Sequence, residues 1–165
     1  MKIVSIIIMV FTLFSCTYYS FSGASIPPHI KSCQVLQFDN MSSRYDLQLS
    51  ERLTDLLIEK IESYNLLTIE NDKDSDSKIV GIIKSFSDNV SSKVDDDTVE
   101  KRVIKLVITI QFFDNLNNIP IVKKRSVSKE KEYNESEGDD GFNLALDELL
   151  DEISDDAALT LVSNW

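Results

Sequence analysis

Residues 103–112 read Val103-Ile104-Lys105-Leu106-Val107-Ile108-Thr109-Ile110-Gln111-Phe112, and this stretch decides the fold. Its even-numbered residues are all large and apolar, whereas its odd-numbered residues include a lysine, a threonine and a glutamine. Because successive side chains of a β-strand point to opposite faces, this alternation predicts a strand with one buried face and one wetter face. We expect the strand over residues 99–113, and other elements must cover its apolar face.

Three other runs of β-compatible residues are bounded by turn formers and are expected to lie in the same sheet. They span residues 32–38, 79–87 and 121–133. Residues 115–120 are rich in turn formers and short enough to join the strand at 99–113 to the last run as an antiparallel hairpin. The first run carries apolar side chains on both faces, so Cys33 within it is expected to be a small buried hydrophobic residue.

Two segments have apolar residues at every third or fourth position, the spacing of an amphipathic helix. The first covers residues 47–64, with Asp46 as its N-cap and Asn65 in the left-handed conformation at its end. The second covers residues 142–165, after a break at residues 138–141, and its acidic residues are expected to face solvent. The order strand, helix, three strands, helix predicts an α+β fold, a two-layer sandwich with two helices packed on one face of a four-stranded mixed sheet.

The N-terminus has the features of a bacterial lipoprotein signal. Lys2 precedes an apolar run over residues 3–14, which is too short to cross a bilayer comfortably. The run leads into Leu13-Phe14-Ser15-Cys16, and lipoprotein signal peptidase needs a branched apolar residue three positions before the cysteine and a small residue just before it. We expect cleavage before Cys16 and acylation of its thiol, which would hold the protein to a membrane. The alternatives are an ordinary secretory signal with a chance cysteine, or a buried N-terminal strand.

These features predict three parts in the chain: a signal peptide over residues 1–15, a lipidated tether over residues 16–30 and a single domain over residues 31–165. A mature length of about 150 residues is typical of one domain. The formal net charge of −11 argues against a nucleic-acid binder. The chain has two cysteines, so with Cys16 acylated we expect neither a disulfide nor a cysteine-based metal site.

Two acidic patterns resemble chemical sites but lack the residues that would complete them. Asp72, Asp74 and Asp76 have the spacing that opens a calcium loop, but the glycine and the bidentate glutamate of that loop are missing, which predicts a solvated turn. The carboxylates of the last helix have no histidine, glycine loop or nucleophile to complete a catalytic site. The one histidine, His29, is expected on the surface. The sequence therefore predicts no enzyme, no metal and no cofactor beyond the covalent lipid on Cys16.

The segment after the acylated cysteine resembles a known family. Residues 19–28 read Tyr19-Ser20-Phe21-Ser22-Gly23-Ala24-Ser25-Ile26-Pro27-Pro28. This segment is similar to the start of mature LptE-like lipoproteins, the lipopolysaccharide-assembly outer-membrane lipoproteins of the Bacteroidetes type, in which a Tyr-Ser-Phe-x-Gly-Ala-Ser-Ile-Pro-Pro run closely follows the lipidated cysteine. The order of elements and the ending Asn164-Trp165 are similar too, so the resemblance covers essentially all of the mature protein.

The resemblance implies an outer-membrane lipoprotein on the periplasmic side that partners and plugs the LptD β-barrel. Such a protein assists the assembly and transport of lipopolysaccharide to the outer leaflet and has no catalytic residues. Residues 17–19 contain no acidic sorting cluster that would send the protein to the cell surface. The alternative is a periplasmic or surface lipoprotein that binds a soluble ligand or an envelope polymer unrelated to lipopolysaccharide.

A set of basic residues on the predicted hairpin is the candidate binding site. It comprises Lys101, Lys105, Lys123, Arg125, Lys129 and Lys131. All have odd numbers, so an unbroken pleat that pairs odd with odd residues would gather them on the sheet face opposite the apolar stripe Ile104–Phe112. That face would suit the phosphates of lipopolysaccharide or acidic residues of the barrel wall. Alternatively, these residues only prevent pairing at an exposed edge, and a β-bulge would scatter the set.

Overall fold

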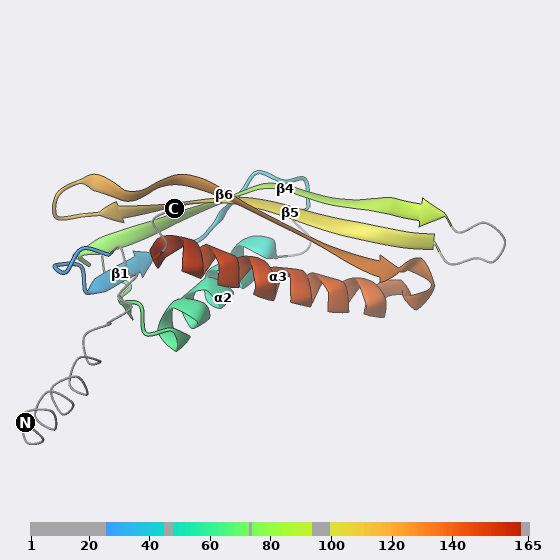
Figure 1. Cartoon of the computed structure of the whole chain (residues 1–165), viewed down its shortest axis with the longest axis horizontal. Coiled ribbons are helices and arrows are strands. Elements are labelled where there is room, and N and C mark those ends of the chain that lie inside the picture. Colours follow the sequence, from blue (N-terminus) through green and yellow to red (C-terminus); the bar gives the residue numbers. More distant parts are fainter. Residues whose placement is uncertain (1–25, 45–47, 73, 94–99, 163–165) are drawn as a thin grey trace, which may run out of the picture.

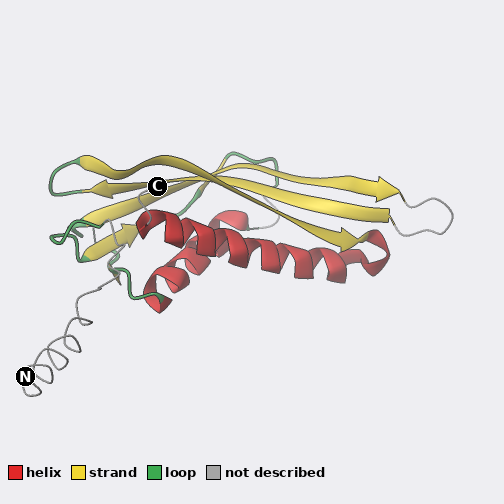
Figure 2. Cartoon of the chain, in the orientation of Figure 1, coloured by secondary structure: helices red, strands yellow, loops and turns green. Residues whose placement is uncertain are grey.

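A mixed β-sheet covered on one face by two helices forms the domain (Figures 1 and 2). In this computed structural model, residues 26–44, 48–72, 74–93 and 100–162 are described. The α+β class, the mixed sheet and the two helices packed against it are as predicted from the sequence, but the sheet has six strands rather than four.

The sheet is built from three long and three short strands. These are β1 (Ser32–Val35), β2 (Asp39–Asn40), β3 (Thr68–Ile69), β4 (Ser77–Lys93), β5 (Glu100–Asp114) and β6 (Ile119–Asn134). The spatial order is β3-β1-β4-β5-β6, and β2 pairs with β4 beyond β1. The pairs that involve β1, β2 and β3 are parallel, whereas β4, β5 and β6 form an antiparallel meander. The two additional strands, β2 and β3, contain only two residues each, too few to show a hydrophobic period.

The first predicted strand, residues 32–38, is divided in the structure. Pairing stops after Val35, and the chain rejoins the sheet at Asp39. Between these points the backbone N–H of Phe38 donates to the hydroxyl of Thr54 on the neighbouring helix, at 3.1 Å. A helix side chain therefore takes the place of a strand as the partner of this backbone group, which the sequence pattern does not reveal.

The alternation that opened the sequence analysis is confirmed in β5. The even-numbered residues from Ile104 to Phe112 are fully buried on the face that the helices cover. On that face β4 contributes Ile79 and Ile83, and Gly81 between them leaves room for the ring of Phe38. A Cβ atom at Gly81 would lie 2.4 Å from this ring, so only glycine fits there without a shift.

The helices are α2 (Leu49–Ser63) and α3 (Gly138–Val162), and a short 3-10 turn, η1 (Glu135–Glu137), precedes the second. The left-handed conformation predicted for Asn65 is confirmed, with φ of 50°. The predicted N-cap, Asp46, lies outside the described residues. Residues 138–141 were expected to break the chain, but α3 already begins at Gly138, where a φ of 58° makes the turn into the helix.

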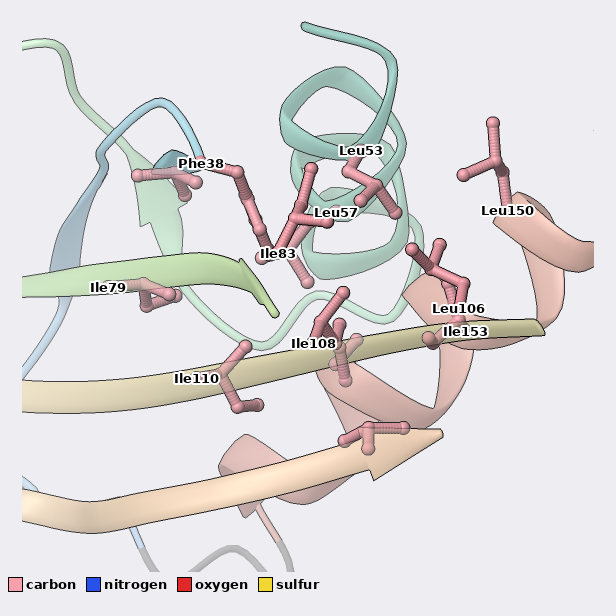
Figure 3. Close-up of a cluster of buried hydrophobic side chains, with 14 of the residues drawn as sticks. Phe38, Leu53, Leu57, Ile79, Ile83, Leu106, Ile108, Ile110, Leu150 and Ile153 are labelled. Atoms are coloured by element: carbon pink, nitrogen blue, oxygen red, sulfur yellow. The ribbon is translucent and has the colours of Figure 1, made fainter. Parts of the chain in front are cut away.

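Both helices contribute apolar side chains to one continuous core (Figure 3). From α2, Leu53 and Leu57 point toward the sheet, where they meet side chains such as Ile83 and Ile108. From α3, Leu150 and Ile153 belong to the same cluster. Cys33 is buried, as predicted, and burial raises the pKa of its thiol to about 11. The two helices therefore cover this face of the sheet, so a partner that binds the sheet would have to contact its other face.

Candidate functional site

The register of β5 and β6 separates the predicted cationic set. Lys131 lies opposite Ile104 and Lys129 opposite Leu106, so both belong to the face that the helices cover. Lys105 lies opposite Glu130, on the other face. Odd residues thus pair with even ones over this part of the hairpin, and the prediction of a single cationic face is wrong. The physical reason is that turn geometry and bulges set hairpin register, and neither is encoded in strand periodicity.

The two lysines on the covered face are engaged with helix α3. Nζ of Lys129 lies 2.9 Å from Oδ2 of Asp156. Nζ of Lys131 lies 2.6 Å from Oε1 of Glu152 and 3.4 Å from Oε2 of Glu148. The hydrogen bond with Glu152 is the main reason that the pKa of Lys131 is raised. Both of these lysines of the edge strand are therefore engaged in ion pairs with α3.

The acidic face of α3 also reaches the other helix. Asp147 pairs with Arg52, and Oδ1 of Asp151 lies 2.6 Å from Nζ of Lys60. The hydroxyl of Tyr64 donates to Asp155. The helix acids were expected simply to face solvent; they are partly exposed, but on both flanks of α3 they form ion pairs and hydrogen bonds with α2 and β6. Sequence reasoning missed these bonds because they join separate elements, and those to α2 join residues more than ninety positions apart.

The second sheet face carries a different set of charges. Lys101 and Lys105 lie near Glu132 and Glu130 of β6, with N–O distances of 3.6 and 3.4 Å. These pairs neutralise one half of the face, the half toward the ends of β5 and β6 that lie away from their connecting turn.

Near the connecting turn the lysines have no acidic partner among the described residues. The pairing of β5 with β6 shifts between Ile110 and Phe112, so Lys123 and Lys124 both lie opposite Gln111 and are exposed. Lys78 of β4 lies over the ring of Phe113, with its Nζ 5.7 Å from the ring centre. Lys123 was part of the predicted set. Lys124 was missed because its even number excluded it, and Lys78 was missed because it lies outside the predicted hairpin. Arg125 lies opposite Ile110 and so belongs to the covered side.

No helix of the described residues lies over this second face, which we call the uncovered face (Figure 2). Alternate residues of β4 and β5 point into it, and its apolar members are half-buried. They are Val80, Ile82, Val103, Val107 and Phe113. These apolar side chains share the face with polar residues such as Thr109 and Gln111. A surface that combines apolar and charged side chains is of the kind on which protein partners pack.

A polar cluster joins the start of α3 to the end of the sheet that lies away from the β5–β6 turn. Nε of Arg102 donates to Asp88 at 3.1 Å and to the hydroxyl of Tyr133 at 2.9 Å, and that hydroxyl donates to Asp88 at 3.0 Å. The ring of Tyr133 packs edge-on against Phe142, with ring centres 5.7 Å apart. An open hollow of about 320 Å³ lies beside the cluster. Because Arg102 already pairs with Asp88 and Glu135, the cluster is a structural clamp rather than an anion site.

A second polar cluster joins the chain entering the domain to the β5–β6 turn. Nε2 of His29 lies 2.8 Å from Oδ2 of Asp114, a residue that is 1% exposed. The backbone N–H and the side-chain amide of Asn117 donate to the same carboxylate at 2.9 and 2.7 Å. Burial alone would raise the pKa of Asp114, but the hydrogen bonds from Asn117 and His29 outweigh it and lower the pKa to about 2. His29 is partly exposed, as predicted, yet it has a structural partner.

The described residues contain no group of three or more histidine, cysteine, aspartate or glutamate side chains arranged to hold a metal ion. Within the same ranges, neither helix has the length and hydropathy needed to span a membrane. Cys16, the predicted site of lipidation, and residues 16–25 lie outside the described residues.

Comparison with solved structures shows the fold. The domain is similar to a DUF330-family protein from Xanthomonas campestris, with a TM-score of 0.53 and 12% identity over 82% of this chain and 88% of that one. It is also similar to PelC from Paraburkholderia phytofirmans, a dodecamer, with a TM-score of 0.51 and 11% identity over 81% and 89% of the two chains. The similarity to lipoprotein GNA1162 from Neisseria meningitidis is lower, with a TM-score of 0.48 and 9% identity over 75% and 98% of the chains. The sequence matches no protein-family model and no curated protein.

Proposed function

We propose that this protein is a lipoprotein of the bacterial outer membrane, anchored through Cys16 on the periplasmic side, and that its domain binds a membrane β-barrel. The observation that supports the anchor is the sequence Leu13-x-Ser15-Cys16 at the end of a signal-length apolar run. The domain contributes binding rather than catalysis in this proposal.

The uncovered face is the observation that supports a protein partner. Three strands spaced about 4.8 Å apart, with about 15 residues each, present a surface of roughly 700 Å². Each partner in a stable complex typically buries about 800 Å². The half-buried apolar residues at its centre, among them Val107, would supply the desolvated middle of such an interface.

The identity of the partner rests on the resemblance of residues 19–28 to LptE-like lipoproteins. This resemblance points to an LptD-type barrel. The protein would plug this barrel and help to assemble it for lipopolysaccharide transport. Lys78, beside the same face, would then meet acidic residues of the barrel, while Lys123 and Lys124 near the turn would meet lipid phosphates. Lys129 and Lys131 would not contribute, because α3 occupies them.

The test is site-specific photo-crosslinking in cells that express the full chain. A photoreactive amino acid replaces Val107 on the uncovered face, and a matched variant carries it at Leu144, an exposed position of α3. We expect the probe at position 107, and not the one at 144, to capture a large β-barrel from detergent-extracted envelopes. Capture of no barrel at either position would reject barrel partnering and favour a lipoprotein that binds a soluble ligand or an envelope polymer.

A further inference from the structure

The end of the domain that holds the β5–β6 turn is also the end at which the tether enters. His29 is bonded to Asp114, the last residue of β5, and the backbone N–H of Asn115 donates to the carbonyl of Asp76 at 2.9 Å. The turn is therefore fixed to the entering chain and to the start of β4. Figure 1 shows β1 and the turn at the same end of the molecule. This end of the domain is therefore the one nearest to the point at which the tether is anchored.

The turn and the first residue of β6 present two large apolar side chains to solvent. Leu116 is 64% exposed and Ile119 is 54% exposed. The turn between them is held by two hydrogen bonds that Asn117 donates to the carboxylate of Asp114. The next residue, Asn118, has a left-handed backbone conformation, with φ of 55°. A fixed turn that carries exposed leucine and isoleucine is suited to enter an apolar or interfacial environment.

The length of the tether limits where this environment lies. Cys16 and His29 are thirteen positions apart, so at no more than about 3.6 Å per position the chain between them spans at most about 47 Å. The fifteen residues of β5 place the opposite end of the sheet about 50 Å from the turn. Standing the domain on its opposite end would lift His29 about 50 Å above the membrane, slightly more than the extended tether spans, so an upright domain has its turn end toward the membrane.

The charges near the turn are mixed. Lys123 and Lys124 lie opposite Gln111, three residues before the end of β5, and no ion pair engages them in the described part of the chain. Asp72 and Asp74 lie in the neighbouring segment before β4 and are exposed. The lysines suit lipid phosphates, while the two acids limit how strongly anionic lipid would attract this end.

We propose that the turn end, defined as Leu116, Ile119, Lys123 and Lys124, rests on the phospholipid surface of the leaflet that carries the lipid on Cys16. The leucine and isoleucine enter the headgroup layer, and the lysines contact phosphates. This docking rests on the proposed anchor, and it would stand the sheet upright on the membrane with the uncovered face turned to the side. A barrel in the same membrane would then meet the part of that face that lies next to the turn end.

The experiment places an environment-sensitive fluorescent amino acid at position 116 of the full chain. A matched variant carries it at position 144, because Leu116 and Leu144 are equally exposed at 64%. Both proteins are reconstituted into vesicles of phosphatidylcholine and phosphatidylglycerol that contain a lipid-borne quencher. We expect quenching at least twofold stronger at 116 than at 144. Equal quenching at the two positions would overturn the proposal.

A charge-reversal pair tests the lysines. Lys123→Glu with Lys124→Glu should reduce the quenching at position 116 by at least half. Lys101→Glu with Lys105→Glu makes the same change of charge at the far half of the uncovered face and should leave it unchanged. Equal effects of the two pairs would show that net charge alone, and not the turn end, governs attachment, which would overturn the role of the lysines.

The mass of the mature N-terminal peptide separates this proposal from the anchor on which it rests. If Cys16 is acylated but quenching is no stronger at 116 than at 144, the proposed anchor stands and the proposed docking is rejected. If Cys16 is unmodified but quenching is stronger at 116 than at 144, the proposed anchor is rejected and the turn end remains a membrane contact.

Discussion

Replacing Leu149 by alanine tests the seam between α3 and the sheet. Leu149 is fully buried, and truncating a leucine at such a site typically costs about 2–5 kcal/mol, since transfer energy is lost and a cavity remains. The total stability of a domain is about 5–15 kcal/mol, so the loss is a large part of it. For a domain of this size we expect a fall in Tm of roughly 6–15 °C, at about 3 °C per kcal/mol. Thermal unfolding followed by circular dichroism measures it.

The matched control is Leu144→Ala, which makes the same chemical change on the same helix at a side chain that is 64% exposed. It should alter the unfolding free energy by no more than about 0.5 kcal/mol, because no cavity forms. Leu149→Asp should do more damage than Leu149→Ala, because it buries an unpaired carboxylate. Equal melting temperatures for Leu149→Ala and Leu144→Ala would show that α3 does not pack on the sheet as described.

Three further changes have expected outcomes that unfolding experiments can check. Gly81→Ala should destabilise the domain by about 1–3 kcal/mol, measured by chemical denaturation, because the new Cβ would meet the buried ring of Phe38; an unchanged midpoint would contradict this packing. Ser154→Ala should raise stability by about 1 kcal/mol, since the buried hydroxyl of Ser154 has no hydrogen-bond partner in the described residues, and a loss of stability would point to a partner. Asp114→Asn should destabilise the protein at neutral pH. Because the folded pKa of Asp114 is lowered from 3.8 to about 2, its contribution is present above about pH 4 and is lost as the pH falls through about 2, so the melting curves of parent and variant should converge in acid; a constant difference would refute the role of the carboxylate.

The hydrophobic period predicted the elements that carry most of the core. The alternation in β5 and the helical spacing in α2 and α3 each extend over ten or more residues, long enough for a period of two or of about 3.6 to stand out. The short strands β2 and β3 have no such period. They exist because β4 offers free backbone groups beside β1 and because the end of α2 returns the chain to the edge of β1. Pairing of this kind depends on elements that are distant in the sequence.

The candidate site was harder to predict than the fold. The sequence identified Lys129 and Lys131 as basic residues of a strand, but their partners Asp156 and Glu152 became visible only when α3 lay beside β6. The uncovered face, the lysines that have no acidic partner in the described residues and the fixed turn with Leu116 likewise follow from register and topology.

The sequence by itself determined where the long strands and the two helices lie and which side of each is apolar, and it predicts the lipoprotein signal that ends at Cys16. These properties are local, because neighbouring residues along the chain set them. The tertiary structure alone decided which charges are neutralised, which sheet face stays uncovered and which end of the domain receives the tether. One shift in the pairing of β5 with β6, between Ile110 and Phe112, brings Lys123 and Lys124 together opposite Gln111. A bulge of this kind reflects the balance of contacts on both faces of a sheet, and no single stretch of sequence contains that balance.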